Sequence, residues 1–135
     1  MSRLVRQYLM RSGALALALA LVLTAIFLPR GAVALLFAVL GWTPMALIGV
    51  AGGGWAVSRF GRVGVGFPLA VLTCILLRLS LGLGGLALAG VYAQVVPYLA
   101  ASLATFAAMQ VYEMLWFLRR SRLQLARGAL LARVG

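Results

Sequence analysis

The sequence predicts an all-α, polytopic membrane protein in which four transmembrane helices pack as two antiparallel hairpins, with both termini in the cytoplasm. Three observations predict this class. Hydrophobic residues make up 65% of the 135 residues and the mean hydropathy is +1.13, more apolar surface than the core of a soluble domain of this size can hide. Four apolar segments are each long enough to cross a bilayer. Almost all charged residues are arginines that flank these segments.

Short polar or glycine-containing breaks separate the four segments. Pro29-Arg30-Gly31 ends the first, and Arg59-Phe60-Gly61-Arg62 separates the second from the third. The turn at Gly90 is so short that the third and fourth helices must be antiparallel neighbours. Pro44 removes a backbone donor inside the second segment and predicts a kink around residues 41–43. The predicted spans are about residues 8–28, 32–58, 65–89 and 92–118, in one four-helix domain (1–118) followed by a basic cytoplasmic tail (119–135).

The first segment also has features of a secretory signal peptide. Basic residues precede its apolar run, and Ala32-Val33-Ala34 matches an A-x-A cleavage pattern. The apolar run continues directly after this tripeptide, which would be a poor start for a mature soluble domain. We therefore interpret the first segment as a retained span.

The distribution of arginines predicts the orientation. The chain has twelve arginines, one acidic residue (Glu113) and no lysine, aspartate or histidine, so its net charge is +11. With four spans, ten arginines fall on the side of the termini, Arg30 falls on the other side, and Arg78 lies inside a span. This asymmetry predicts cytoplasmic termini in a bacterial inner (plasma) membrane. The ten are Arg3, Arg6, Arg11, Arg59, Arg62, Arg119, Arg120, Arg122, Arg127 and Arg133.

The positive charge does not indicate nucleic acid binding, because the arginines flank apolar segments instead of forming a basic face with exposed aromatic residues. The expected partner is the lipid bilayer with its anionic headgroups. The tail after Leu118 either extends the fourth helix or lies along the membrane surface. It serves as a topological anchor, or it docks on a partner protein.

Arg78, in the middle of the third span, is the strongest pointer to function. A charge facing hydrocarbon there would cost roughly 2.5–3.5 kcal/mol, so Arg78 needs a partner. Gln110 and Glu113 lie three residues apart on one helical face and form one candidate, although Arg119 and Arg120 compete for Glu113. The number of residues between each of them and the cytoplasmic end of its predicted span places the Cα atoms of Glu113 and Arg78 roughly 12 Å apart in membrane depth. A carboxylate, lipid phosphate or water outside the chain is therefore the favoured partner.

Small residues supply further candidate contacts. Gly49-x-x-x-Gly53 lets helices approach closely, either within the bundle or against another subunit, which includes a second copy of the chain. Cys74, one turn before Arg78, is expected to be a small packing residue, and as the only cysteine it can form no intramolecular disulfide. With no histidine and one carboxylate, the sequence predicts no metal site, no cofactor and no catalytic acid–base pair. The candidate partner-binding residues are Arg78, Cys74, Gln110, Glu113, Gly49 and Gly53.

With these features the chain resembles the small subunit I of bacterial F-type ATP synthases, an accessory protein of the rotor ring. The resemblance rests on the basic N-terminus, the break after the first span, and a glycine-rich second span ending Gly52-Gly53-Gly54-Trp55-Ala56-Val57-Ser58-Arg59. It also rests on Leu72-Thr73-Cys74-Ile75-Leu76-Leu77-Arg78-Leu79, which places Arg78 where that family usually has lysine. In some members an acidic residue precedes the basic one by a turn, and here Cys74 and Ile75 occupy those positions. The resemblance implies a non-catalytic role in assembling or stabilising the ring of c subunits, whose helices carry an intramembrane carboxylate.

Two other classes of function stay open. The first is a small oligomeric ion or solute transporter or channel. Small multidrug transporters of similar length use a glutamate in their first span, and fluoride channels of similar length carry an asparagine, neither of which is present here. The second is a structural subunit of another membrane complex.

Overall fold

Four long helices make up the computed structural model, which describes residues 2–135. α1 (Arg3–Phe27) ends in a 3₁₀ turn, η1 (Leu28–Arg30). The second long helix consists of α2 (Ala32–Leu47), a π-helical turn η2 (Ile48–Gly52) and α3 (Gly53–Arg59). α4 spans Gly66–Val91 and α5 spans Val95–Val134. All four are long and apolar enough to cross a membrane, which confirms the all-α class and the four potential spans.

The turns between the helices form where the backbone leaves helical geometry. Gly31 follows η1 with a φ of 111°, a conformation that glycine adopts without steric cost. Ala93 has a φ of 55° in the turn after α4, and right-handed helix does not continue through such a residue. The fourth helix therefore begins at Val95, not at Tyr92 as the sequence predicted.

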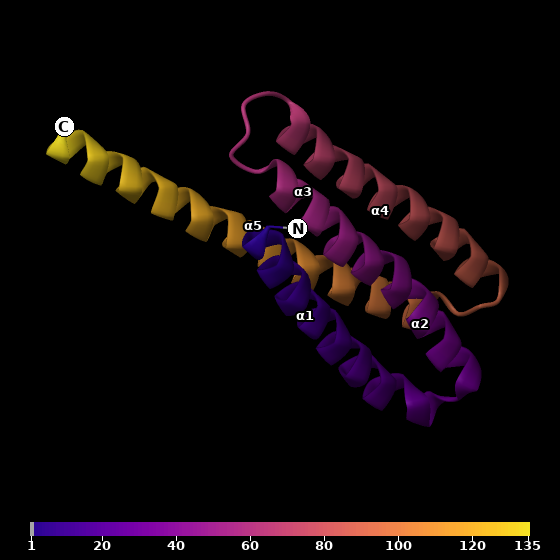
Figure 1. Cartoon of the computed structure of the whole chain (residues 1–135). Helices are drawn as coiled ribbons and strands as arrows, with labels where there is room; N and C mark the ends of the chain where they lie inside the picture. The colour runs from indigo at the N-terminus through magenta and orange to yellow at the C-terminus, as the bar shows by residue number, and fades with distance from the viewer. Residues whose placement is uncertain (1) are drawn as a thin grey trace.

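The four helices are arranged around a central pair. Consecutive long helices run antiparallel, and α1 and α4 lie on opposite sides of α2 and α5 (Figure 1). The predicted hairpin of α4 and α5 is present, but the main neighbour of α5 is α2, which runs parallel to it. Small residues explain this pairing. A Cβ added at Gly41 would lie 2.6 Å from the Tyr98 carbonyl oxygen, so the two backbones approach closely there.

A π-helical turn, η2, interrupts the second long helix four residues after Pro44. Helical structure is continuous from Ala32 to Leu47, and the backbone widens only in η2. Two of the five residues in η2 are glycines, Gly49 and Gly52. Glycine tolerates the wider π-helical turn because it has no side chain to clash, and such turns often occur at functional positions.

The basic tail continues α5 without a break. The helix passes Leu118 and ends at Val134, and its last turns project beyond the bundle (Figure 1). Every residue from 122 to 135 is exposed. Of the two predicted arrangements of the tail, the structure therefore has the extension of the fourth helix.

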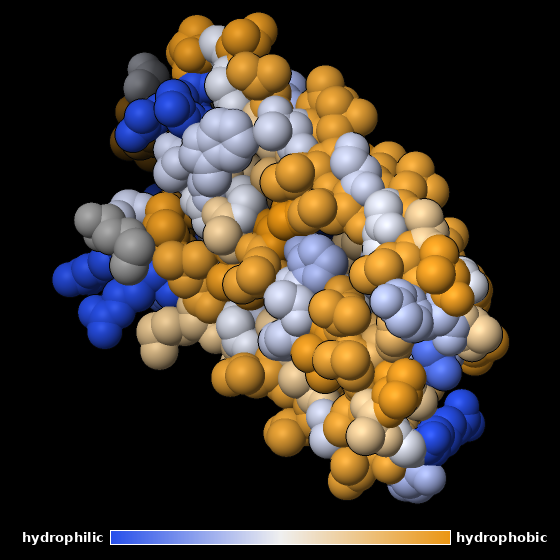
Figure 2. All heavy atoms as spheres, turned by 90° about the vertical axis from the view of Figure 1, so that its right-hand side faces the viewer, coloured by the Kyte–Doolittle hydropathy of each residue, from blue (hydrophilic) through white to orange (hydrophobic). Residues whose placement is uncertain are grey.

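The outer surface of the bundle is apolar enough for a lipid bilayer. Large exposed side chains along the helices are mostly leucines, for example Leu21 and Leu83. Hydrophobic atoms cover most of the face shown in Figure 2, and strongly hydrophilic atoms gather toward its edges. This pattern agrees with helices that cross hydrocarbon and end in polar surroundings.

Two glycine substitutions test the close packing of α2 on α5. Gly41→Ala should lower the free energy of unfolding by about 1–3 kcal/mol, because the new methyl group meets backbone atoms of Tyr98 and Ser102. Gly84→Ala is the matched control, since nothing lies within 4 Å of a Cβ added there. It should be neutral or stabilising by about 0.5–1 kcal/mol. Unfolding titrations in detergent measure both, and equal effects would contradict the close approach.

Candidate functional site

Arg78 is buried at the contact between α4 and α5, with only 1% of the residue exposed. Its Nη2 forms an ion pair with Glu113 Oε1, and its Nη1 donates a hydrogen bond of 3.0 Å to Gln110 Oε1. The guanidinium carbon lies 5.9 Å from the centre of the Phe106 ring, at the outer range of a cation–π contact. Three side chains of one helix therefore surround the charge.

The spacing of these residues along α5 explains why they meet Arg78. Phe106, Gln110 and Glu113 are separated by four and three positions, so they share one helical face. On α4, Ala70 and Cys74 precede Arg78 at intervals of four, and all three are buried. Arg78 meets the face of α5 that carries Gln110 and Glu113, whereas Cys74, one turn earlier, packs against η2.

The depth argument that favoured an external partner for Arg78 is wrong. It took Leu118 as the end of the fourth helix, but α5 continues to Val134, so Leu118 marks no boundary of the helix. Depth is better counted from the turn that joins α4 and α5. Arg78 lies thirteen residues before Val91 and Glu113 eighteen residues after Val95. The five-residue difference corresponds to roughly 7.5 Å, which the long arginine side chain spans.

α1 contributes a buried tyrosine to the same region. Tyr8 is fully buried, its hydroxyl donates a hydrogen bond of 3.0 Å to the Gly49 carbonyl oxygen in η2, and it lies beside the Glu113 carboxylate. Its ring occupies the space that a side chain at Gly53 would need. It also lies 5.6 Å from the centroids of the Tyr112 and Trp116 rings. Tyr8 therefore ties α1 to the glycine-rich turn and to α5.

The remaining candidate residues serve packing within the chain. Gly49 and Gly53 are buried, and a Cβ at Gly49 would meet the Met109 side chain on α5. Cys74 is a free, buried thiol, and a Cβ at Gly52 would lie 2.5 Å from its sulfur. All six candidates lie in the interior of the bundle or along its helix contacts. The small-residue motif thus has its contacts inside this chain.

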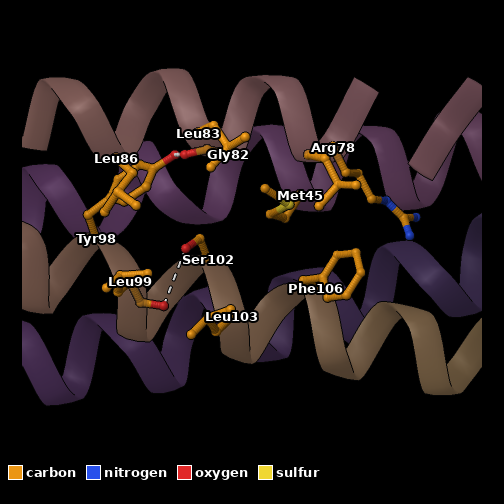
Figure 3. Close-up of a pocket in the computed structure, with 11 residues that line it drawn as sticks. Met45, Arg78, Gly82, Leu83, Leu86, Tyr98, Leu99, Ser102, Leu103 and Phe106 are labelled. Carbon is orange, nitrogen blue, oxygen red and sulfur yellow. Dashed lines mark hydrogen bonds between the residues drawn. The ribbon is translucent and has the colours of Figure 1, made fainter. Parts of the chain in front are cut away.

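An apolar cavity of about 190 Å³ lies beside Arg78 between α4 and α5 (Figure 3). The guanidinium group points away from the cavity, whereas Phe106 and Met45 lie along it. Its polar side chains are already engaged: the Tyr98 hydroxyl donates to Gly82 O (3.0 Å) and the Ser102 hydroxyl to Leu99 O (3.3 Å). The cavity therefore suits apolar material.

The site as a whole offers little chemistry. Glu113 is the only acidic side chain of the chain and is paired with Arg78. Among residues 2–135 no group of three or more His, Cys, Asp or Glu side chains is placed to hold a metal ion. The arrangement can hold two helices together electrostatically.

Sequence reasoning missed the residues that α1 brings to the interior. Tyr8 is one, and Ala16 is another, since its carbonyl oxygen accepts a hydrogen bond of 3.0 Å from Nε1 of Trp42 on α2. A signal was present in each case, because a tyrosine or tryptophan inside an apolar segment carries a polar group that needs a partner. Comparison of the chain with protein-family models, curated proteins and solved structures finds no match.

A double-mutant cycle tests the role of the Arg78–Glu113 pair. Arg78→Leu alone leaves a buried carboxylate without its partner and should destabilise the bundle by roughly 3–5 kcal/mol. Arg78→Leu combined with Glu113→Leu should recover most of this loss, because both charges are then gone. Arg127→Leu, on the exposed tail, is the control for loss of one arginine. Thermal unfolding and the amount of folded protein extracted in detergent measure the effect.

Two results would count against the pair. Unchanged stability of the Arg78→Leu variant would mean that the ion pair contributes nothing. A double variant as unstable as Arg78→Leu would mean that Arg78 acts through a contact other than Glu113.

Proposed function

We propose that the chain is a non-catalytic accessory protein of a membrane complex, and that it assists the assembly or stability of the rotor (c) ring of an F-type ATP synthase. The internal Arg78–Glu113 pair carries the first part of this proposal. It occupies the chain's only acidic side chain, so no free carboxylate remains for acid–base chemistry or for carrying an ion across the membrane. The resemblance to subunit I supplies the identity of the complex.

The buried pair changes how such a protein would contact the ring. An exposed arginine would suit the intramembrane carboxylate of a c subunit directly. Arg78, however, is 1% exposed and already paired, so a direct contact would require it to exchange partners. We assign Arg78 a positioning role instead: it holds one face of α4 against α5 and thereby turns the opposite face outward.

That outward face of α4 is the proposed contact surface. Leucines recur along it at alternating spacings of three and four residues, and each is at least half exposed. This spacing is typical of the contact between two packed helices. In such a contact, each side chain of one helix fits into a space formed by four side chains of the other helix. The leucine face consists of Leu69, Leu72, Leu76, Leu79 and Leu83. A hydrophobic helix of a ring subunit is the partner that such a face fits within a membrane.

The orientation belongs to the same proposal. The N-terminus, the 60–65 loop and the tail of α5 lie at one end of the bundle, and the other two turns lie at the opposite end (Figure 1). The first end carries ten arginines and the second carries Arg30. The positive-inside rule supports a cytoplasmic location for the first end in a bacterial inner membrane.

Topology reporters test the orientation. A reporter enzyme that is active only in the periplasm should be inactive when fused after Gly135 and active when inserted at Arg30 or Gly90. A reporter that is fluorescent only in the cytoplasm should give the opposite pattern. Periplasmic activity after Gly135 would contradict cytoplasmic termini.

Co-purification with c subunits tests the partner and the surface together. Leu72→Ala combined with Leu76→Ala should lower the recovery of c subunits with the tagged chain at least about fivefold, since truncating central contact residues costs more than about 1 kcal/mol each. Leu17→Ala with Leu21→Ala on α1 is the matched control, because these leucines are also exposed. It should leave recovery unchanged. Absence of c subunits from the unmodified preparation would refute the ring as partner, and equal losses would refute the leucine face.

A further inference from the structure

A hollow of about 360 Å³ lies between α1 and α5 at the arginine-rich end of the bundle. α1 contributes Gln7 and Arg11 to it, one helical turn apart. α5 contributes aromatic and basic residues, among them Arg119 and Arg120. Three arginines therefore line one hollow, and the chain's single acidic side chain, Glu113, is paired with Arg78 elsewhere. The hollow has positive charge without a counter-ion from a side chain of this protein.

One of the three arginines is held in place by the helices around it. Arg120 Nη2 donates a hydrogen bond of 3.3 Å to Gln7 Oε1. Its guanidinium carbon also lies 5.4 Å from the centre of the Trp116 ring, which is a cation–π distance. A guanidinium fixed in this way loses less conformational freedom when it binds an anion, and its planar donors suit a phosphate group.

Tyr112, another residue that lines the hollow, has a buried hydroxyl without a partner. The Tyr112 oxygen is shielded from solvent and has no hydrogen-bond partner within the described part of the chain. Buried hydroxyl groups in proteins are normally paired. An anion beside Arg11 and Arg119 would supply the acceptor that this hydroxyl lacks.

The position of the hollow along the helices indicates what kind of anion it meets. Arg11 precedes the uninterrupted apolar run that begins at Ala14, and Arg119 follows the apolar part of α5 directly. Both therefore lie where the hydrocarbon of a bilayer gives way to headgroups. Leu115, also part of the lining, continues the hollow toward the hydrocarbon side. A basic site with an apolar extension fits a phosphate that carries an acyl chain.

We propose that this hollow binds the phosphate of an anionic phospholipid. Arg11, Arg119 and Arg120 contact the phosphate oxygens, the Tyr112 hydroxyl donates to one of them, and an acyl chain lies along Leu115. The site is separate from the leucine face on α4 and does not depend on which protein partner the chain has. It differs from general attraction to a negative membrane because it uses particular arginines in a formed hollow.

Lipid binding to the full chain in a neutral detergent tests the proposal. Native mass spectrometry and lipid-dependent thermal stability should show one phosphatidylglycerol bound per chain, at least about tenfold more tightly than phosphatidylcholine. Arg11→Gln with Arg119→Gln should weaken this binding at least about tenfold, since each arginine near a headgroup contributes on the order of 1 kcal/mol. Arg127→Gln with Arg133→Gln removes the same charge from the exposed tail and should change binding less than twofold.

Tyr112→Phe separates binding from folding. Without added lipid the variant should be as stable as the parent chain or more stable, because it removes a buried hydroxyl that has no partner. Its affinity for phosphatidylglycerol should nevertheless fall severalfold. An affinity equal to that of the parent chain would remove Tyr112 from the site.

Three outcomes would overturn the proposal as a whole. Equal weakening by the two arginine pairs would mean diffuse charge attraction instead of a site. Displacement of the lipid by inorganic phosphate at millimolar concentration would assign the hollow to a soluble anion. Equal binding of phosphatidylcholine would mean that the acyl chain, and not the anionic headgroup, is recognised.

Discussion

The burial of one opposite-charge pair constrains the whole bundle. Arg78 cannot face hydrocarbon without a large penalty, and a carboxylate such as Glu113 has the same restriction. Their pairing turns the Arg78 face of α4 and the Glu113 face of α5 toward each other. Once this rotation of α4 is set, the leucines on its opposite side must face outward. A single polar contact in the interior thus determines which apolar surface a neighbour can reach.

Close packing of small residues holds together helices that the ion pair does not connect. Two helices in lipid gain little from hydrophobic burial against each other, so they need close backbone contact and hydrogen bonds. Gly41 permits this contact between α2 and α5, and Gly53 leaves room for the Tyr8 ring. The Tyr8 hydroxyl then bonds to Gly49 in η2, beside Glu113. The small residues and the charged pair therefore belong to one packed region that joins all four long helices.

Much of the fold was predictable because its signals are local. Length, hydropathy and breaks at Pro29 and Gly90 are read from a few consecutive residues, and they defined four helices close to those observed. The partner of Arg78 was less predictable, because it depends on where α5 ends and how the two helices are offset. The spacing of Gln110 and Glu113 identified the correct face, but the assumed helix end placed it at the wrong depth. The α2–α5 pairing was likewise hidden, since small residues on a helix do not say which neighbour they meet.

The charge balance of the chain links its interior to its surroundings. A net charge of +11 with a single acidic side chain means that the protein can neutralise only one arginine with its own side chains. The interior uses that one carboxylate for Arg78, where an unpaired charge would be most costly. Every arginine at the end of the bundle must then find its counter-ion in lipid headgroups, in a partner or in solution. Arg11, Arg119 and Arg120 share a formed hollow with an unpaired hydroxyl, so for them the counter-ion has a defined place. The arginines of the exposed tail, such as Arg127 and Arg133, are open to solvent, so counter-ions in solution or at the membrane surface can screen them.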